Sequence, residues 1–419
     1  MSYQIYSCLE REQRLKHGPL GAFIDELATV LLERGYSKRD LVVRFAVIEE
    51  LNGWLIRKRI KLFDFDQSRI DQFIRHRSKQ ESMSRRGEMV TLDLLLGMLR
   101  IHGEIPFLQP EERSQNEIER ILSRYNHYLV EMQGLSSSTV SNYLCRTRRF
   151  LLKIFDSRAV DFGAVCAQSI TRFVREYAPQ YSCGESGLMV CALRSFLRFL
   201  LLQGEIAVDL ASCVPTVPNR RHASVPQYLS AQELEHLLER NKGECPLQIR
   251  NHAILLLLSR LGLRASEVVV LTLEDIDWEH GELIINGKGA RQTRFPLPVD
   301  VGEALVAYLK NGRPSCSTRR LFICSRAPVR PLKGSSTVST IVRRCLRTAG
   351  LNPTNKGAHL LRHTLATECL RKGATLPEVG ELLRHRQIDT TAIYAKVDFT
   401  RLETIARPWP DPRFSGGEA

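Results

Sequence analysis

The chain reads His359-Leu-Leu-Arg362-His363 near its C-terminus, continues through Leu383-Arg384-His385-Arg386 and reaches Tyr394 nine residues after His385. Cleaving a phosphodiester with a side chain requires a nucleophile, cations that bind the phosphate oxygens and an acid that protonates the departing oxygen. This segment supplies a phenol, a guanidinium and imidazoles, and imidazoles exchange protons near neutral pH. It therefore indicates chemistry on a nucleic-acid backbone, and the rest of the chain should supply further positive charge.

The composition of the 419-residue chain favours a nucleic-acid partner. The net charge of +14 and the pI near 9.4 indicate a polyanionic partner, either nucleic acid or an anionic membrane surface. The longest central apolar run, Ala253 to Leu258, is far shorter than the ~20 residues of a membrane span. The N-terminus shows no secretory signal. We therefore expect no membrane contact and a bacterial cytoplasmic, nucleoid-associated location.

The cysteine pattern gives no sign of a metal site. The eleven cysteines form no C-x-x-C pair and show no Cys/His ligand spacing. This usage is typical of reduced thiols in a cytosolic protein. We expect no metal and no cofactor.

The first half of the chain is predicted to be helical and to contain a repeat. Residues 1–110 and 111–206 both show apolar residues at three- and four-residue spacing. Three matches recur in order at offsets of 99, 100 and 101 residues (134−35, 170−70 and 204−103): Gly35 with Gly134, Ile70 with Ile170, and Gly103 with Gly204. Chance similarity between helices is the alternative, but the nearly constant offset favours a duplicated helical module.

Clusters of basic residues along this half are candidate contacts to DNA phosphates, and a solvated helix face is the alternative for each. A helix is predicted to begin at Ser37 and another at Ser136. The prolines of residues 207–228 indicate an extended linker. The predicted DNA contacts are Arg57, Lys58, Arg59, Arg146, Arg148, Arg149, Arg220 and Arg221.

Residues 229–397 are predicted to form a mixed α+β domain, so the fold class is mainly α with a small antiparallel sheet. Ser230 and Glu233 form a capping-box pattern at its first helix. A Gly-rich hairpin turn carries Lys288, and Arg291 follows it as a further DNA contact. The predicted helices are 249–261, 301–309, 338–349, 360–372 and 376–383, and the predicted strands are 268–273, 282–285 and 294–298.

The candidate nucleophile is Tyr394, whose ordinary pKa of about 10 means that it needs a base or a cationic pocket. Arg264 and Arg362 can bind phosphate oxygens bidentately, which lysine cannot imitate. Lys288 can protonate the leaving 5′ oxygen. Each of these residues alone could have an ordinary packing, capping or turn role. The ordered set favours catalysis.

Three histidines accompany this set. His359 and His385 can exchange protons and hydrogen-bond the phosphate. His359 lies three residues before Arg362 and is expected to share a helix face with it. His363 is assigned to a different face and to a structural role.

In order and spacing, the motifs around Arg264, Lys288, His359, Arg362, His385 and Tyr394 resemble those of the tyrosine recombinase (phage integrase) family. The resemblance covers residues 229–397 and extends loosely to 112–206, which are similar to the family's helical core-binding domain. It implies that the six residues assemble around the scissile phosphate and that Tyr394 forms a 3′-phosphotyrosyl link. A free 5′ hydroxyl then reverses the reaction without ATP or metal.

Two sequence details refine this resemblance. Glu267 is expected to support the site without taking part in the reaction. Arg384 stands where the family usually has glycine. We expect it either to cost about 1 kcal/mol in a left-handed backbone or to add a phosphate contact.

The remaining predictions concern partners and role. The resemblance implies double-stranded DNA with specific recombination sites, a dimer on one site and a tetramer in synapsis. The tail 398–419 either docks on a neighbouring protomer or packs on its own domain. Integration or transposition of a mobile element, with sister recombinases as candidate partners, is the predicted role. A type IB topoisomerase and a DNA-binding accessory protein are the alternatives, and a metal-dependent nuclease is disfavoured because paired carboxylates are missing.

Overall fold

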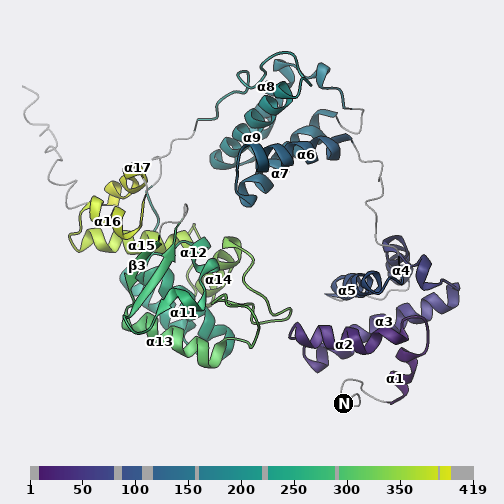
Figure 1. Ribbon diagram of the computed structural model, residues 1–419. Helices are drawn as coiled ribbons and strands as arrows, with labels where there is room; N and C mark the ends of the chain where they lie inside the picture. Colours follow the sequence, from purple (N-terminus) through teal and green to yellow (C-terminus); the bar gives the residue numbers. More distant parts are fainter. Residues whose placement is uncertain are drawn as a thin grey trace, which may run out of the picture. The chain divides into compact units, whose positions relative to one another are not determined.

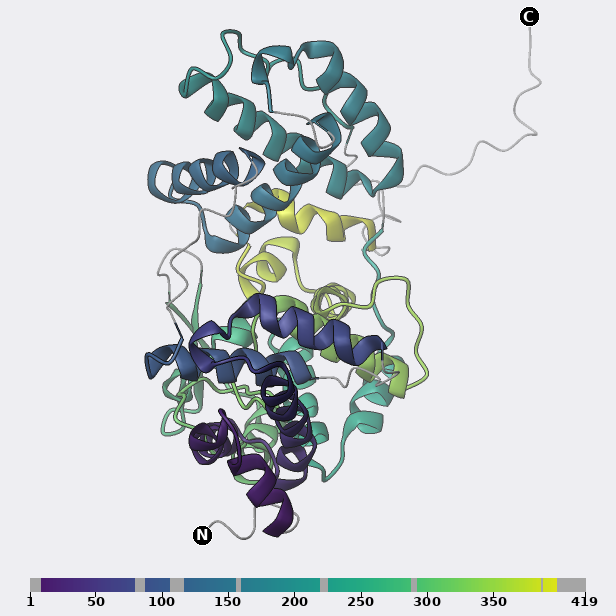
Figure 2. The same cartoon turned by 90° about the vertical axis from the view of Figure 1, so that its right-hand side faces the viewer.

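The computed structural model describes residues 9–79, 87–105, 117–155, 160–218, 225–287, 292–385 and 387–397. The chain is mostly helical (Figures 1 and 2) and divides into two compact units, Met1–Phe107 with Ser224–Ala419, and Leu108–Ala223. No helix among the described residues is long and apolar enough to cross a membrane. Four predicted site residues and the predicted docking tail lie outside the described residues: Arg220, Arg221, Lys288, Arg291 and 398–419.

The N-terminal part is a bundle of helices closed around one apolar core. The predicted helix start at Ser37 is confirmed, because its side chain accepts a hydrogen bond from the Asp40 backbone while the Asp40 carboxylate accepts one from Ser37 N at 3.0 Å. Phe45, Trp54 and Phe73 are buried in the core. The elements are α1 (Leu9–Lys16), η2 (Gly21–Phe23), α2 (Ile24–Glu33), α3 (Lys38–Lys58), η3 (Leu62–Asp64), α4 (Gln67–Lys79) and α5 (Glu88–Ile101).

The second helical part has a core rich in aromatic side chains. Tyr125 packs edge to face on Phe196 with ring centroids 5.1 Å apart, and Phe150 does the same on Phe173 at 5.1 Å. Such ring pairs add to the gain from apolar burial. The elements are α6 (Glu117–His127), η4 (Tyr128–Met132), α7 (Ser137–Phe155), η5 (Phe162–Ala164), α8 (Ala167–Tyr177), η6 (Ala178–Gln180) and α9 (Cys183–Leu202).

The C-terminal part surrounds the apolar helix α11 with further helices and a small sheet (Figure 1). The predicted capping box of Ser230 and Glu233 is confirmed at the start of α10. The five predicted helices are also confirmed. The elements are α10 (Ala231–Asn241), α11 (Pro246–Arg260), α12 (Ala265–Val270), η7 (Leu273–Asp275), α13 (Val299–Ala307), η8 (Tyr308–Gly312), α14 (Ser335–Thr348), α15 (Ala358–Arg371), α16 (Leu376–Leu382), α17 (Ile388–Thr391) and η9 (Ala392–Val397).

The sheet is antiparallel, as expected, with strand order β1 (Ile276–Asp277), β2 (Glu282–Asn286) and β3 (Gln292–Pro296). Leu283 of β2 pairs with Phe295 of β3, so both inward side chains reach the core. The predicted strand at 268–273 is wrong. Its valines belong to helix α12, because Glu267 accepts a hydrogen bond from the Arg264 backbone and so caps the helix start.

A small apolar cluster, separate from the main core of the C-terminal part, lies among its last helices. Leu370, Val379 and Leu383 pack with Tyr394 and Val397. The cluster joins α15, α16 and η9, and it fixes the tyrosine beside the polar residues of α15.

Candidate active site

Arg362 lies on α15 and ties three segments of the domain together. Its side chain is buried, and its terminal nitrogens donate to the carbonyl oxygens of Gly262 and Leu383. Burial and the neighbouring charges of Arg264 and Arg384 lower the pKa of Arg362 to about 10, so the guanidinium stays protonated at neutral pH. A fixed cation of this kind is suited to binding a phosphate oxygen.

A buried carboxylate, Glu267, holds two further arginines. It accepts hydrogen bonds from the Arg264 backbone N–H at 2.7 Å and from Arg264 Nη1 at 2.9 Å. Arg384 Nη2 donates to the same carboxylate at 2.9 Å, and Arg264 Nη2 donates to the Arg384 carbonyl oxygen at 3.2 Å. Glu267 thus positions both guanidiniums, which is the supporting role expected of it.

Arg384 departs from the ordinary backbone of an arginine. Its φ of 54° is left-handed, a conformation that costs a residue other than glycine about 1–2 kcal/mol. Its guanidinium carbon lies 4.7 Å from the centroid of the Phe295 ring. The ion pair with Glu267 and this cation–π contact offset the cost. Among the described residues, Arg384 Nε and Nη1 are buried without a hydrogen-bond partner.

Tyr394 lies in η9 and is only 1% exposed. Its Oη is 2.7 Å from Nδ1 of His363, and its ring lies parallel to the His385 ring with centroids 6.4 Å apart. Burial raises the pKa of Tyr394 to about 12, although the charge of Arg362 acts in the opposite direction. The phenol is therefore protonated at neutral pH and needs an acceptor for its proton before it can attack phosphorus.

The assignment of His363 to a separate face is wrong, because its side chain contacts the candidate nucleophile Tyr394. Positions 359 and 363 are four residues apart on α15, so their side chains share a face, and the two imidazole centroids are 6.3 Å apart. Burial, His359 and Arg362 lower the pKa of His363 to about 4, which leaves an unprotonated ring at neutral pH. The four-residue spacing is the sequence signal that identifies this residue.

The other two histidines of the site are also neutral bases. His385 Nδ1 is 2.7 Å from the hydroxyl of Thr391, which fixes the imidazole beside Tyr394. Burial first, and then the positive charges of Arg362 and Arg264, lower the pKa of His385 to about 4. The same three causes lower the pKa of His359.

The structure thus brings five of the six predicted catalytic residues together: Arg264, His359, Arg362, His385 and Tyr394. The sixth, Lys288, lies outside the described residues, on the connection between β2 and β3. Within the described ranges, no group of three or more His, Cys, Asp or Glu side chains is placed to hold a metal ion.

Comparisons with known proteins agree with this geometry. The phage integrase family matches residues 227–401, and the SAM-like N-terminal domain of phage integrases matches residues 122–204. The chain is 36% identical over 397 residues to the putative integrase/recombinase y4rA of Sinorhizobium fredii, covering 95% of this chain and 96% of the relative. This chain belongs to the tyrosine recombinase, or phage integrase, family. Its members cut and rejoin DNA, and the recombinase described here is an enzyme of that kind.

Other relatives and solved structures fit the same family. The recombinase is 31% identical over 303 residues to the tyrosine recombinase XerD of Mycobacterium tuberculosis, covering 68% of this chain and 95% of XerD. XerH bound to a palindromic difH substrate shares its fold with a TM-score of 0.54 at 22% identity, over 69% of this chain and 86% of XerH. A lambda integrase dimer on a COC′ core site gives a TM-score of 0.50 at 16% identity, over 80% and 91%.

The predicted DNA contacts of the second helical part need one correction. Arg146 is buried and its guanidinium binds the Glu185 carboxylate and the Asn142 carbonyl, so it holds α7 to α9 instead of facing a phosphate. Arg148 binds Glu119, and Arg149 lies 3.7 Å from Glu185. Both of these arginines are half-exposed and stay predicted contacts.

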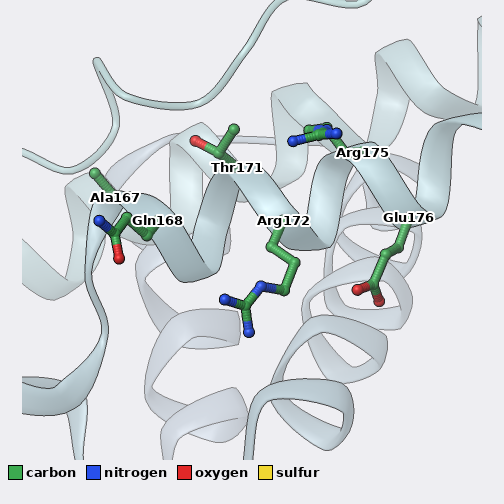
Figure 3. Close-up of a pocket in the computed structure, with 6 residues that line it drawn as sticks. All are labelled: Ala167, Gln168, Thr171, Arg172, Arg175 and Glu176. Carbon is green, nitrogen blue, oxygen red and sulfur yellow. The ribbon is translucent and has the colours of Figure 1, made fainter.

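The sequence prediction missed two cations on α8 of the recombinase. Figure 3 shows Arg172 and Arg175 on one helix with Gln168 and Thr171, where they line a pocket of about 700 Å³. Both arginines are exposed. Neither has an ion-pair partner among the described residues, so they are better placed for phosphate than Arg146.

Proposed function

We propose that this recombinase cleaves and rejoins DNA at specific sites through a covalent 3′-phosphotyrosyl intermediate on Tyr394. One observation carries the proposal: the Tyr394 hydroxyl lies 2.7 Å from His363 Nδ1, beside the buried cation Arg362. The nucleophile Tyr394, the proton acceptor His363 and the phosphate-binding cation Arg362 therefore lie close together in space.

Arg362 and Arg264 bind the non-bridging oxygens of the scissile phosphate. Arg264 is 37% exposed, so its guanidinium can reach bound DNA while Glu267 holds it in place. Arg362 keeps unused N–H donors after binding two carbonyl oxygens, since a guanidinium has five. His359 and His385 hydrogen-bond the phosphate from the same side.

Proton transfers balance in both directions of the reaction. Tyr394 Oη attacks phosphorus, its proton passes to His363 Nδ1, and the P–O5′ bond breaks. Lys288 protonates the departing 5′ oxygen. In rejoining, a 5′ hydroxyl attacks the phosphotyrosine, gives its proton to Lys288, and the phenol recovers its own from His363.

Bound DNA strengthens His363 as a base. Burial lowers the pKa of His363 in the free protein, and the charges of His359 and then Arg362 lower it further. A phosphate monoanion on that arginine offsets its charge, so the pKa of His363 rises when substrate is bound.

The buried phenol also has to be uncovered by movement of η9 (Ala392–Val397) before it reaches phosphorus.

We further propose that the recombinase acts on a mobile element, in integration or transposition, in the cytoplasm at the bacterial nucleoid. The similarity to y4rA and, at 31% identity over 403 residues, to y4rF of the same Sinorhizobium fredii strain supports a system with sister recombinases. A lambda integrase tetramer on a Holliday junction shares the fold at a TM-score of 0.51. This supports a tetramer in synapsis, and the lambda integrase dimer on one core site supports a dimer there. We propose that the tail 398–419 joins the protomers.

The test uses a DNA duplex from the ends of the encoding element, nicked near the cleavage point so that the cut strand diffuses away. The wild-type protein should form a covalent adduct that survives denaturing electrophoresis without metal, and Tyr394→Phe should form none. An adduct with Tyr394→Phe would overturn the assignment of the nucleophile. Relaxation of supercoils by a lone protomer, without pairing of two duplexes, would favour a topoisomerase.

A further inference from the structure

The two helical parts of the recombinase share a series of four elements in the same order, with one extra 3-10 helix, η6, between the last two helices of the second part. Helix α3 is followed by η3, α4 and α5, and helix α7 by η5, α8 and α9. The starts of α3 and α7 are 99 residues apart (137−38), those of η3 and η5 are 100 apart (162−62), and the ends of α5 and α9 are 101 apart (202−101). Because a 3-10 turn matches as well as three helices, the two parts share one backbone plan.

The details inside these elements also repeat. Gly35 and Gly134 precede the long helix with φ of 81° and 56°, and Gly103 and Gly204 follow the last helix with φ of 72° and 70°. Corresponding side chains are buried at corresponding places. These buried pairs are Ile70 and Ile170, Phe73 and Phe173, Leu95 and Phe196, Leu99 and Leu200, and Ile105 and Ile206.

One surface feature of the N-terminal part points to a ligand. A pocket of about 350 Å³ is lined by the end of α3 and the start of α4, including Lys58, Arg59 and Arg69, with Asp64 as its one carboxylate. Lys58 and Arg59 are exposed and have no ion-pair partner among the described residues, while Arg69 donates to the Gln72 side chain at 3.1 Å. The pocket therefore has an excess of positive charge.

Two further observations at this pocket are independent of its charge. Trp54 also lines it, is 3% exposed, and keeps a buried indole N–H that has no acceptor within the described residues. Buried donors normally have a partner, so this one is available to an acceptor in the pocket. Arg59 is the C-cap of α3, and its left-handed backbone with φ 53° ends the helix at the edge of the pocket.

The geometry points to a second DNA-contacting module at residues 9–105, with this pocket as its phosphate site. Lys58, Arg59 and Arg69 supply the charge that binds the phosphate, and Trp54 forms part of the wall of the pocket. The occupant is the backbone of double-stranded DNA outside the segment bound by the rest of the chain. The inference rests on the proposed function only in taking DNA as the partner.

A second basic pocket, in the second helical part, supports this assignment. It also lies on the third element of the repeat, α8, and is also lined by arginines without ion pairs in the described chain, Arg172 and Arg175 (Figure 3). The two pockets share one corresponding position at the offset of 100 (172−72), which is Gln72 in the first pocket and Arg172 in the second. Each repeat thus offers cations from the same helix.

The experiment compares the full-length protein with a variant that carries Lys58→Gln, Arg59→Gly and Arg69→Gln. Glycine at position 59 removes the charge without opposing the left-handed backbone. A matched control carries Arg34→Gln, Lys38→Gln and Arg39→Gln, which removes the same charge near the opposite end of the 21-residue helix α3. The readouts are the hydroxyl-radical footprint on a long duplex and the salt dependence of binding.

The pocket variant should lose protection at the outer flanks of the footprint. Its slope of log K against log salt should fall by about one for each phosphate that the variant no longer binds. The control should match the wild type on both measures. A footprint and slope unchanged in the pocket variant, or changed equally in the control, would overturn the inference.

Adduct formation at Tyr394 separates this inference from the proposed function. On a duplex trimmed to the minimal cleaved segment, the pocket variant should form the adduct at the wild-type rate. A normal adduct with an unshortened footprint removes only the N-terminal site. A shortened footprint with no adduct from any protein removes only the proposed chemistry.

Discussion

The active site and the N-terminal pocket each hold an arginine with a left-handed backbone. Arg384 has φ 54° and Arg59 has φ 53°, and among the described residues they are the two that are not glycine with positive φ. Their surroundings differ. Arg384 is bound to Glu267 and stacked on Phe295, whereas Arg59 is exposed and has no ion-pair partner in the described chain.

This difference separates two roles of arginine: a buried arginine is held in position for the reaction, and an exposed arginine attracts phosphate. A buried cation loses its hydration and remains only where carboxylates or carbonyls replace the missing water, as they do around Arg362 and Arg384. Such a charge is fixed before substrate arrives, which is what a transition state requires. An exposed cation gives up little water and binds a phosphate wherever the helix presents it. The next experiments test this division.

The largest effect is expected at the most buried cation. Arg362→Ala leaves the carbonyls of Gly262 and Leu383 without donors, at about 1–3 kcal/mol for each buried group. We expect a clearly lower urea midpoint and no detectable adduct. Arg362→Lys should recover part of the stability but little of the activity, because one ammonium cannot replace the paired N–H donors of a guanidinium. Full activity with lysine would show that charge alone suffices.

The next effect concerns the proton of Tyr394. Asparagine at position 363 offers an acceptor near the place of Nδ1 but cannot take up a proton, so His363→Asn should lower the adduct rate by roughly 10²-fold or more. The substrate should carry sulfur at the 5′ bridging position, because a thiolate leaves without an acid. With no acid needed, adduct rates measured from pH 4 to 9 report the base that accepts the proton of Tyr394.

The sign of the pH dependence follows from the lowered pKa. The pKa of His363 is about 4 in the free protein and rises when phosphate is bound, so the wild-type adduct rate should fall as the pH drops through a bound-state pKa above 4 and should stay level at higher pH. His363→Asn should lose this limb and rise with pH, as hydroxide takes over. His280→Asn, which changes an exposed histidine bound to Asp277, is the control. An unchanged rate in His363→Asn would return it to a positioning role.

A smaller effect is expected where the backbone and the side chain oppose each other. Arg384→Gly removes a left-handed cost of about 1–2 kcal/mol and also removes the ion pair with Glu267 and the Phe295 contact. We expect the free energy of unfolding to stay within about 1 kcal/mol of the wild type, because these effects offset each other. The adduct rate should fall by roughly tenfold, since Glu267 loses one of its two anchors.

A second outcome would change the interpretation of Arg384. Asparagine tolerates the left-handed region better than most residues. If Arg384→Asn and Arg384→Gly both cleave as fast as the wild type, the arginine contributes neither to the phosphate site nor to the position of Glu267. Urea unfolding and the adduct assay on the same samples separate the two contributions.

Many helix starts and the candidate site were predictable, because the residues that determine them lie close together in the sequence. Capping residues such as Ser37 and Ser230 mark helix starts through hydrogen bonds within four residues. The polar motif of α15 and η9 gave the candidate site because its residue types match phosphodiester chemistry. His363 was also within reach, since the spacing of four places it beside His359.

The failures came from interactions that residue type alone does not reveal. The valines of α12 look like a strand, but the cap made by Glu267 decides for a helix. Arg146 looks like a phosphate contact, and only the fold shows Glu185, 39 residues later, bound to it. The pocket of Trp54 and Arg69 depends on how α3 meets α4, which no spacing along the chain reports.

The smallest effect is expected for Arg59→Gly. It tests the comparison between the two left-handed arginines most directly, because Arg384 receives the same substitution. Arg59 has no ion-pair partner among the described residues, so Arg59→Gly removes the backbone cost without breaking an ion pair there. We expect the N-terminal part to gain about 1 kcal/mol, measured by hydrogen exchange of α3 amides in the full-length protein. Affinity for long duplexes should fall by only a few-fold. A loss of stability in Arg59→Gly would mean that its guanidinium is also held by the protein, and the division between fixed and free cations would fail.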